Sequence, residues 1–260
     1  MMPTPHPSPE TGPPQVPQYG RAAILALWSA ATIPMGLLTW VIAPAIERPA
    51  FNVAWFKVLV ALSTVGLAWQ FVLTVLVLIW EQRSFDLTAW RRALWLQRPR
   101  RPEPSTTREV ARRRYWWVLV PMIVAFTLES AIPELPSPAS RDFASYLDSN
   151  IGRSFLHGNV TWFVVIVALC VFNTVIGEEL WFRGVLLPRM ASAFGSWDWA
   201  VNGVLFAAYH VHMPWAMPSI VLDGPILAYP TKRFRSTWLG IIVHSVQSVV
   251  ILLVVGAIVW

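Results

Sequence analysis

The chain has 260 residues, of which 55% are hydrophobic and 13% are charged, and its mean hydropathy is +0.51. A soluble domain carries about a quarter charged residues, so this composition excludes an ordinary soluble protein. The 16 Trp residues agree, because tryptophan favours the membrane–water boundary. The single cysteine, Cys170, excludes an internal disulfide. We therefore expect an all-α fold, a polytopic transmembrane helical bundle of about six to eight spans.

Residues 1–21 are predicted to form a disordered tail, because they contain seven prolines and few apolar residues. A single membrane-embedded helical domain, residues 22–260, follows. Its mainly apolar stretches are 22–46, 51–80, 115–132, 160–190, 197–213, 216–228 and 238–260. The stretch 216–228 is short and contains Asp223, Gly224 and Pro225, so we expect it to be broken or re-entrant.

The loop 81–114 carries ten Arg and four acidic residues, and their difference equals the net charge of +6 of the whole chain. The positive-inside rule places this loop in the cytoplasm, and the tail with it, since two spans separate them. Residues 134–159 then face the other side of the cell membrane, and 231–236 face the cytoplasm. Nucleic-acid binding is an alternative interpretation of the arginines, but topology and contact with anionic lipid explain them more simply, so we expect no nucleic-acid partner.

Within this loop, the apolar residues Leu87, Trp90 and Leu94 recur at helical spacing beside Arg91 and Arg92. This pattern is typical of an amphipathic helix lying on the membrane surface. Such a helix would bring the arginines close to lipid headgroups.

The stretch 160–190 contains the first cluster of ionisable residues. On a helix, Glu179 and Arg183 lie four residues apart on one face, so they can neutralise each other. Glu178 points about 100° away and has no local partner. Ionisable side chains in a membrane are costly and mark functional sites. Glu178 is therefore a candidate for chemistry, and the alternative is a structural ion pair with one spare carboxylate facing water.

Two histidines occupy later spans. His210 shares a helix face with Phe206, and His244 shares one with Ser248. His212 points elsewhere and is interpreted as a packing residue. Three further polar residues are interpreted as helix-contact or supporting groups: Asn173, Asn202 and Asp223.

Glu178, His210 and His244 lie on three different predicted helices and could converge in a polar cavity. A glutamate and a neutral histidine can activate water, and a serine hydroxyl can donate a hydrogen bond to an oxyanion. Two histidines and one glutamate are also a known zinc ligand set. The residues therefore allow amide hydrolysis either without a cofactor or with one divalent metal, such as zinc.

The order of these motifs resembles the CAAX prenyl protease and bacteriocin-processing family, also called the CPBP or Abi family of intramembrane proteases. The family's motifs are Glu-Glu-x-x-x-Arg, then Phe-x-x-x-His, then a second His in the last span. The matching residues are Glu178, Glu179, Arg183, Phe206, His210 and His244. The resemblance covers about residues 160–250, the expected catalytic core.

The resemblance implies a hydrolase that cleaves membrane-associated proteins or peptides in a cavity open to the cytoplasm. It implies that Glu178 and His210 activate water, with His244 and Ser248 near the oxyanion and with Glu179, Arg183 and Phe206 in supporting roles. The family is described as metalloproteases, and a metal-free glutamate mechanism is also argued for it. The third motif usually ends in Asn, where this chain has Ser248, a hydroxyl with a shorter reach.

Two other functions fit parts of the sequence. A non-catalytic scaffold or bacteriocin-immunity protein with the family fold would explain Ser248. A transporter would explain buried charges, but the sequence has no repeated half of the kind that transporters often show. Proteolysis accounts for the most motifs.

Overall fold

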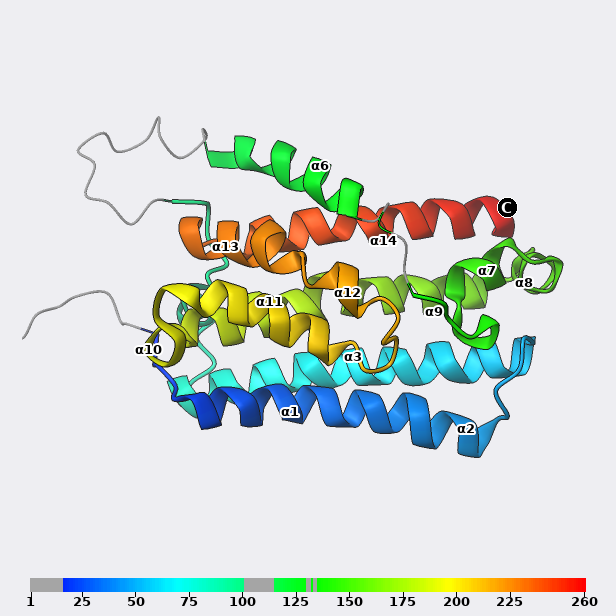
Figure 1. The fold of residues 1–260 in the computed structure, drawn as a ribbon, viewed down its shortest axis with the longest axis horizontal. Helices are drawn as coiled ribbons and strands as arrows, with labels where there is room; N and C mark the ends of the chain where they lie inside the picture. The colour runs from blue at the N-terminus through cyan, green and yellow to red at the C-terminus, as the bar shows by residue number, and fades with distance from the viewer. Residues whose placement is uncertain (1–15, 101–114, 130–131, 133–134) are drawn as a thin grey trace, which may run out of the picture.

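The computed structural model describes residues 16–100, 115–129, 132 and 135–260 (Figure 1). Helices make up most of these residues, and no strand occurs among them. The predicted all-α fold is therefore confirmed.

Four helices in the described ranges are long and apolar enough to cross a membrane. They are Arg21–Ile46, Val53–Gln82 (α3), Val160–Arg189 and Thr237–Val259 (α14). The first joins α1 (Arg21–Leu37), η1 (Leu38–Ile42) and α2 (Ala43–Ile46), and the third begins with α9 (Val160–Val171). Each coincides with a predicted stretch to within a few residues. These helices support a multi-pass membrane protein.

The other three predicted spans are shorter in the structure, so the described part of the chain does not confirm a count of six to eight. In the stretch 115–132, residues 115–129 form η2 (Tyr115–Val118) and α6 (Leu119–Glu129), and residues 130–131 lie outside the described residues. The stretch 197–213 forms α11 (Asp198–Tyr209), which at 1.5 Å per residue is about 18 Å long, against about 30 Å for the hydrocarbon layer.

The stretch 216–228 is broken, as predicted. It forms α12 (Met217–Ile220) and, beyond a turn, the π-helix η8 (Gly224–Ala228), which continues as α13 (Tyr229–Phe234). The break falls at Asp223, Gly224 and Pro225, where proline removes a backbone donor. The remaining short helices are α4 (Leu87–Ala93), η3 (Ala139–Arg141), α7 (Phe143–Asp148), α8 (Asn150–Leu156), α10 (Ala191–Phe194) and η7 (Gly195–Trp197).

Three segments that are distant in sequence meet at one end of the bundle. The backbone amide of Tyr19 donates to the carbonyl of Arg189 (3.0 Å), that of Arg100 to Phe234 (2.9 Å), and that of Thr237 to Trp95 (3.0 Å). Helices α7 and α8 lie at the opposite end (Figure 1). Residues 16–20, the described start of the basic loop and the turn 231–236 thus lie at the same end of the bundle. Residues 101–114 of that loop lie outside the described residues, and which end faces the cytoplasm stays a prediction.

The last residues of the predicted tail are tied to the bundle. The Gln18 side chain donates to the carbonyl of Pro188 (2.8 Å), and the Tyr19 hydroxyl donates to Glu81. Glu81 also forms two charged hydrogen bonds with Arg189, at 2.5 and 2.6 Å. Burial, and then the bond to Glu81, raises the pKa of Tyr19 to about 12, so its hydroxyl remains protonated. The ordered chain therefore begins before residue 21, while residues 1–15 lie outside the described residues.

The predicted amphipathic helix is present as α4, and the Asp86 side chain caps it by accepting from the amide of Thr88 (2.8 Å). Leu94, the residue that follows α4, is only 4% exposed and lies next to Gly184. The start of the basic loop thus packs against the protein itself, in addition to any contact with lipid.

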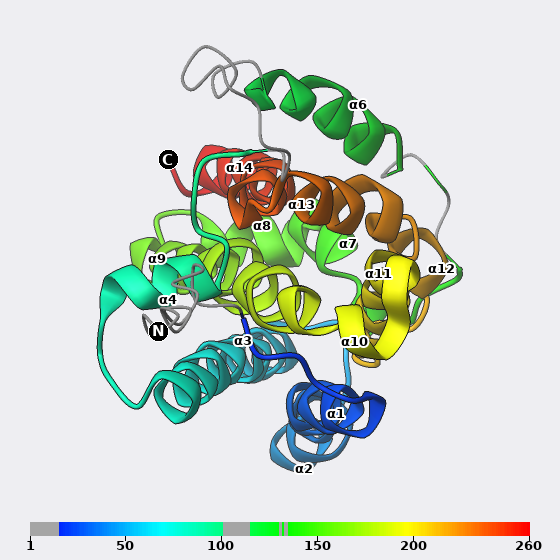
Figure 2. The same ribbon diagram turned by 90° about the vertical axis from the view of Figure 1, so that its left-hand side faces the viewer.

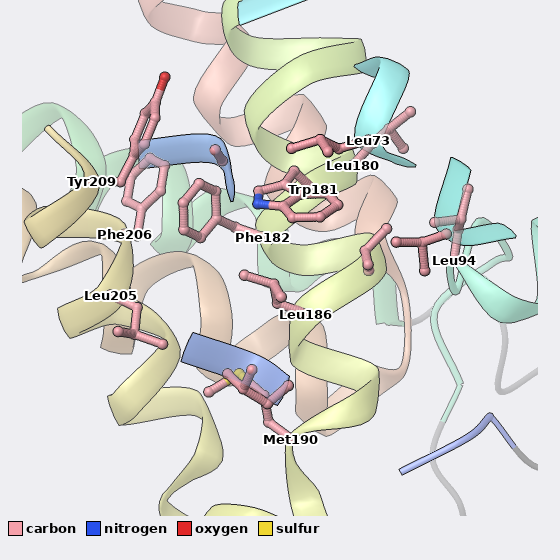
Figure 3. Packing of buried hydrophobic residues seen from close by; sticks show 14 of the residues in the cluster. Leu73, Leu94, Leu180, Trp181, Phe182, Leu186, Met190, Leu205, Phe206 and Tyr209 are labelled. Atoms are coloured by element: carbon pink, nitrogen blue, oxygen red, sulfur yellow. The ribbon is translucent and has the colours of Figure 1, made fainter. Parts of the chain in front are cut away.

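The helix 160–189 lies in the middle of the bundle, between α3 and α1 on one side and α14 on the other (Figure 2). Its second half supplies the centre of the largest apolar cluster, where Trp181, Phe182 and Leu186 are fully buried (Figure 3). Phe206 and Tyr209 of α11 pack onto Phe182 at ring-centroid distances of 5.0 and 5.3 Å. This cluster fixes the helix that carries Glu178.

Candidate active site

The helix that carries the two glutamates is a π-helix over most of its second half. Two π-helical segments, η4 (Phe172–Gly177) and η5 (Glu179–Leu186), flank Glu178. Such i→i+5 hydrogen bonding is rare and occurs frequently at functional sites. The regular α-helical angles assumed from the sequence therefore do not apply here, and the partners of each glutamate must come from the structure.

Glu178 is 1% exposed, and the side chains of Asn173 and His210 lie near its carboxylate. With its amide nitrogen turned toward the carboxylate, Asn173 donates to both oxygens of Glu178, at 3.1 and 3.2 Å. The Nε2 atom of His210 lies 3.9 Å from Oε1 of Glu178. That separation is too long for a direct hydrogen bond but suits one bridging water.

His210 follows the last residue of α11 and is 7% exposed. Its Nδ1 atom lies 2.8 Å from the carbonyl oxygen of Phe206, which can only accept. Nδ1 therefore carries a proton, and in the neutral ring Nε2, the atom nearer Glu178, is free to accept one.

Counted at 1.5 Å per residue from the predicted span starts at Trp197 and Trp238, His210 lies about 20 Å and His244 about 10 Å along their helices, so the sequence places the two at different depths. The structure removes the conflict, because the His210 ring reaches back one turn to Phe206. Phe206 is about 12 Å along α11, and His244 is about 10 Å along α14. Both histidine rings contact the Phe206 ring, at centroid distances of 4.8 and 6.0 Å.

Glu179 has two partners rather than the one predicted. The expected ion pair is present, with 3.2 Å between Oε1 of Glu179 and a terminal nitrogen of Arg183, and both side chains are fully buried. In addition, Nδ1 of His244 lies 3.0 Å from the same oxygen. His244 is therefore oriented by Glu179, and its Nε2 atom is the one left for other contacts.

A glycine on α14 makes room for this carboxylate. A Cβ atom on Gly240 would lie 2.2 Å from Oε2 of Glu179, so no larger residue fits beside the glutamate as it stands. Gly240 is one turn before His244 on the same helix face. The sequence does not show that the Glu179 carboxylate occupies the space beside Gly240, because the two residues are far apart along the chain.

Arg183 packs against the Phe206 ring beside the two histidines. Its guanidinium carbon is 3.9 Å from the centroid of the Phe206 ring, a cation–π contact that is worth most away from water. The Phe206 ring thus contacts Arg183 as well as both histidines, which explains why an aromatic residue suits this position.

Ser248 is placed one turn beyond His244 and is 6% exposed. Its hydroxyl lies 3.0 Å from the hydroxyl of Thr174, which itself donates to the carbonyl of Cys170. Ser248 therefore shares the predicted helix face with His244, but the structure gives it Thr174, a residue that the sequence did not single out, as its hydrogen-bond partner.

Asn202, His212 and Asp223, which the sequence placed outside the catalytic set, each have different surroundings. Asn202 donates to the carbonyl of Phe182 (2.9 Å), which is the helix contact expected of it. His212 stacks on His210, with centroids 5.4 Å apart and an interplanar angle of 27°. Asp223 is 4% exposed, and its Oδ1 atom has no hydrogen-bond partner among the described residues.

The sequence leaves open a zinc site formed by Glu178, His210 and His244. Within the described ranges, no group of three or more His, Cys, Asp and Glu side chains is placed to hold a metal ion. His244 binds Glu179, while Glu178 faces His210. Each histidine does have a partner at Nδ1, an arrangement that would suit a ligand or a base equally.

Comparison with known proteins supports the resemblance seen in the sequence. Residues 159–250 match the family model described as type II CAAX prenyl endopeptidase Rce1-like, which is consistent with the CPBP family. No curated protein and no solved structure matches the chain. The matched residues include the two glutamates, Arg183, Phe206 and both histidines of the site.

Proposed function

We propose that the chain is an intramembrane endopeptidase, because residues 159–250 match a CAAX-type intramembrane protease family. It would hydrolyse peptide bonds of membrane-associated proteins or peptides. The observation that carries this proposal is the buried carboxylate of Glu178 facing Nε2 of His210 at 3.9 Å within the matched region.

Water activation is the role that suits this pair. A water between Oε1 of Glu178 and Nε2 of His210 can donate one hydrogen bond to each. As its oxygen attacks the scissile carbonyl carbon, one proton passes to Glu178 or His210. Asn173, bonded to both oxygens of the carboxylate, keeps Glu178 in place. The same proton can later pass to the leaving amine, so the pair returns to its starting state.

The negative charge that develops on the substrate oxygen needs a hydrogen-bond donor. His244 is placed for this role, because its Nδ1–H donates to Glu179 and the ring is thereby oriented; Nε2 would donate to the substrate oxygen when both ring nitrogens carry a proton. Ser248 would add a second donor if its hydroxyl turned from Thr174. Glu179 and Arg183 act through His244 and do not touch the substrate in this scheme.

The proposal also assigns a role to each part of the chain. Residues 160–250 would be the catalytic core, and the preceding spans would complete the bundle around it. The tail and loop 81–114 would face the cytoplasm of the cell, and the bilayer and a membrane-associated substrate would be the partners.

A comparison of membrane proteomes tests the activity whatever the natural substrate is. Cells that express the wild type or Glu178→Gln would be compared by quantitative mass spectrometry of membrane protein termini. We expect new termini only with the wild type, and Glu47→Gln, the same change outside the site, should behave like the wild type. Identical termini in all three would favour a scaffold or immunity protein with this fold.

A further inference from the structure

A buried polar contact joins α3, which lies outside the matched region, to the end of α11. Gln70, halfway along α3, and Tyr209, the last residue of α11, are both 0% exposed. The amide nitrogen of Gln70 donates to the Tyr209 hydroxyl at 2.5 Å. A glutamine buried in a membrane span is costly without such a bond, so its presence there needs a reason.

The end of α11 is the place where His210 is attached. The terminal residues of a helix lack part of their backbone hydrogen bonding and fray readily. His210 is the capping residue of α11, and its ring packs on that of Tyr209 at 5.2 Å. In Figure 3 the Tyr209 hydroxyl points away from Phe206 and Phe182. The bond from Gln70 therefore fixes the last turn from outside α11.

The same face of α3 also contacts the backbone next to Glu178, the partner of His210. A Cβ atom on Gly177, the residue before Glu178, would lie 3.0 Å from the backbone carbonyl of Leu67. Leu67 and Gln70 are three residues apart and share a helix face. One rigid helix face is thus in contact with the backbone next to Glu178 and, through Tyr209, with the backbone next to His210.

Building on the proposed function, we propose that Gln70 and Tyr209 are positioning residues that set the distance between the Glu178 carboxylate and the His210 imidazole. Neither needs to touch the substrate. Their effect is to hold two groups on different helices at the spacing of one bridging water, and small misplacements of reacting groups reduce rates steeply.

Two small substitutions test this in purified protein, with an internally quenched farnesylated peptide ending in a CAAX sequence as the probe. Tyr209→Phe removes only the hydroxyl, and Gln70→Met keeps the chain length but removes the amide. We expect each to lower kcat by about tenfold with KM nearly unchanged. The double variant should be no slower than the slower single variant, because both changes break the same bond.

Tyr146→Phe is the matched control, because Tyr146 is also buried and its hydroxyl has no hydrogen-bond partner among the described residues. It should leave kcat unchanged. If Tyr209→Phe and Gln70→Met kept full kcat, or if their losses multiplied in the double variant, the proposal would be overturned. Failure of either variant to fold would assign the pair to stability and would also overturn it.

Amide hydrogen exchange separates this inference from the proposed function. Exchange in residues 206–213 should become faster in Tyr209→Phe and Gln70→Met, and it should not change in Tyr146→Phe or Glu178→Gln. If the wild type cleaved the probe no faster than Glu178→Gln, the proposed function would fail, and unchanged exchange in 206–213 would separately refute the positioning role.

Discussion

At the scale of single residues, each glutamate of the site has its own histidine. Glu178 faces His210, and Glu179 binds both Arg183 and His244. The spacing of Glu179 and Arg183 predicted their ion pair, because the two are local in sequence. The bond from Glu179 to His244 spans 65 residues and depends on a π-helix and on the gap at Gly240, neither of which a helical repeat reveals.

Gly240→Ala tests whether that gap matters. The added methyl group would meet the Glu179 carboxylate, which would have to move away from His244. We expect a loss of about 1–3 kcal/mol in the free energy of unfolding and a large fall in activity. Gly256→Ala is the control on the same helix, since a Cβ there has only ordinary contacts, at 3.8 Å or more. Equal thermal midpoints for the two variants in detergent would contradict this role for Gly240.

Whether activity requires a metal ion also depends on single side chains of the site. In the proposed mechanism Glu178 and His210 activate the water, and no group of three or more metal-ligating side chains comes together in the part of the chain that the structure describes. We expect purified active protein to lose no activity on treatment with a strong zinc chelator and to contain far less than one zinc per chain. Stoichiometric zinc, lost together with activity on chelation and restored with it, would refute the metal-free mechanism.

At the scale of elements, the long apolar helices and the short helix α4 were predictable, but the early end of α11 was not. A run of about 20 apolar residues is sufficient to predict a span, which is why the four candidate spans match. The stretch 197–213 contains Asp198, Asn202 and two histidines, and its helix stops at Tyr209, where His210 bonds back to Phe206. The contacts at that end are tertiary, such as the bond from Gln70 to Tyr209, and a single sequence does not show them.

The contact between α11 and η8 leads to a prediction about how closely these two helices must pack. A Cβ on Gly203 would lie 2.3 Å from the Cα of Gly224, so the two backbones touch. Gly203→Ala should push η8 away from α11 and lower the free energy of unfolding by about 1–3 kcal/mol. Gly20→Ala, at a glycine with nothing within 4 Å of its Cβ position, should have little effect on the thermal midpoint. A smaller effect for Gly203→Ala than for Gly20→Ala would show that this close approach is not required.

At the scale of the whole molecule, the distribution of charge predicts that the tail, the basic loop and the turn before α14 share one side of the membrane. The described parts of these segments meet at one end of the bundle through backbone hydrogen bonds. The side of the membrane follows only from the positive-inside rule.

Paired cysteine labelling tests that orientation. A cysteine in place of Ser84, at the basic end, should be protected from a membrane-impermeant thiol reagent in intact cells. A cysteine in place of Ser154 of α8, at the opposite end, should be labelled. The native Cys170 is buried and should contribute little. Labelling at Ser84 with protection at Ser154 would reverse the orientation of the bundle.

The proposed function of the whole molecule rests on the proposal that Glu178 activates water, and peptide cleavage by purified protein tests this most directly. Wild type, Glu178→Gln and Glu47→Gln would be compared in lipid nanodiscs with the quenched farnesylated peptide. We expect the wild type and Glu47→Gln to cleave it at similar rates and Glu178→Gln to be at least about a hundredfold slower while still folded. Full activity in folded Glu178→Gln would contradict the mechanism.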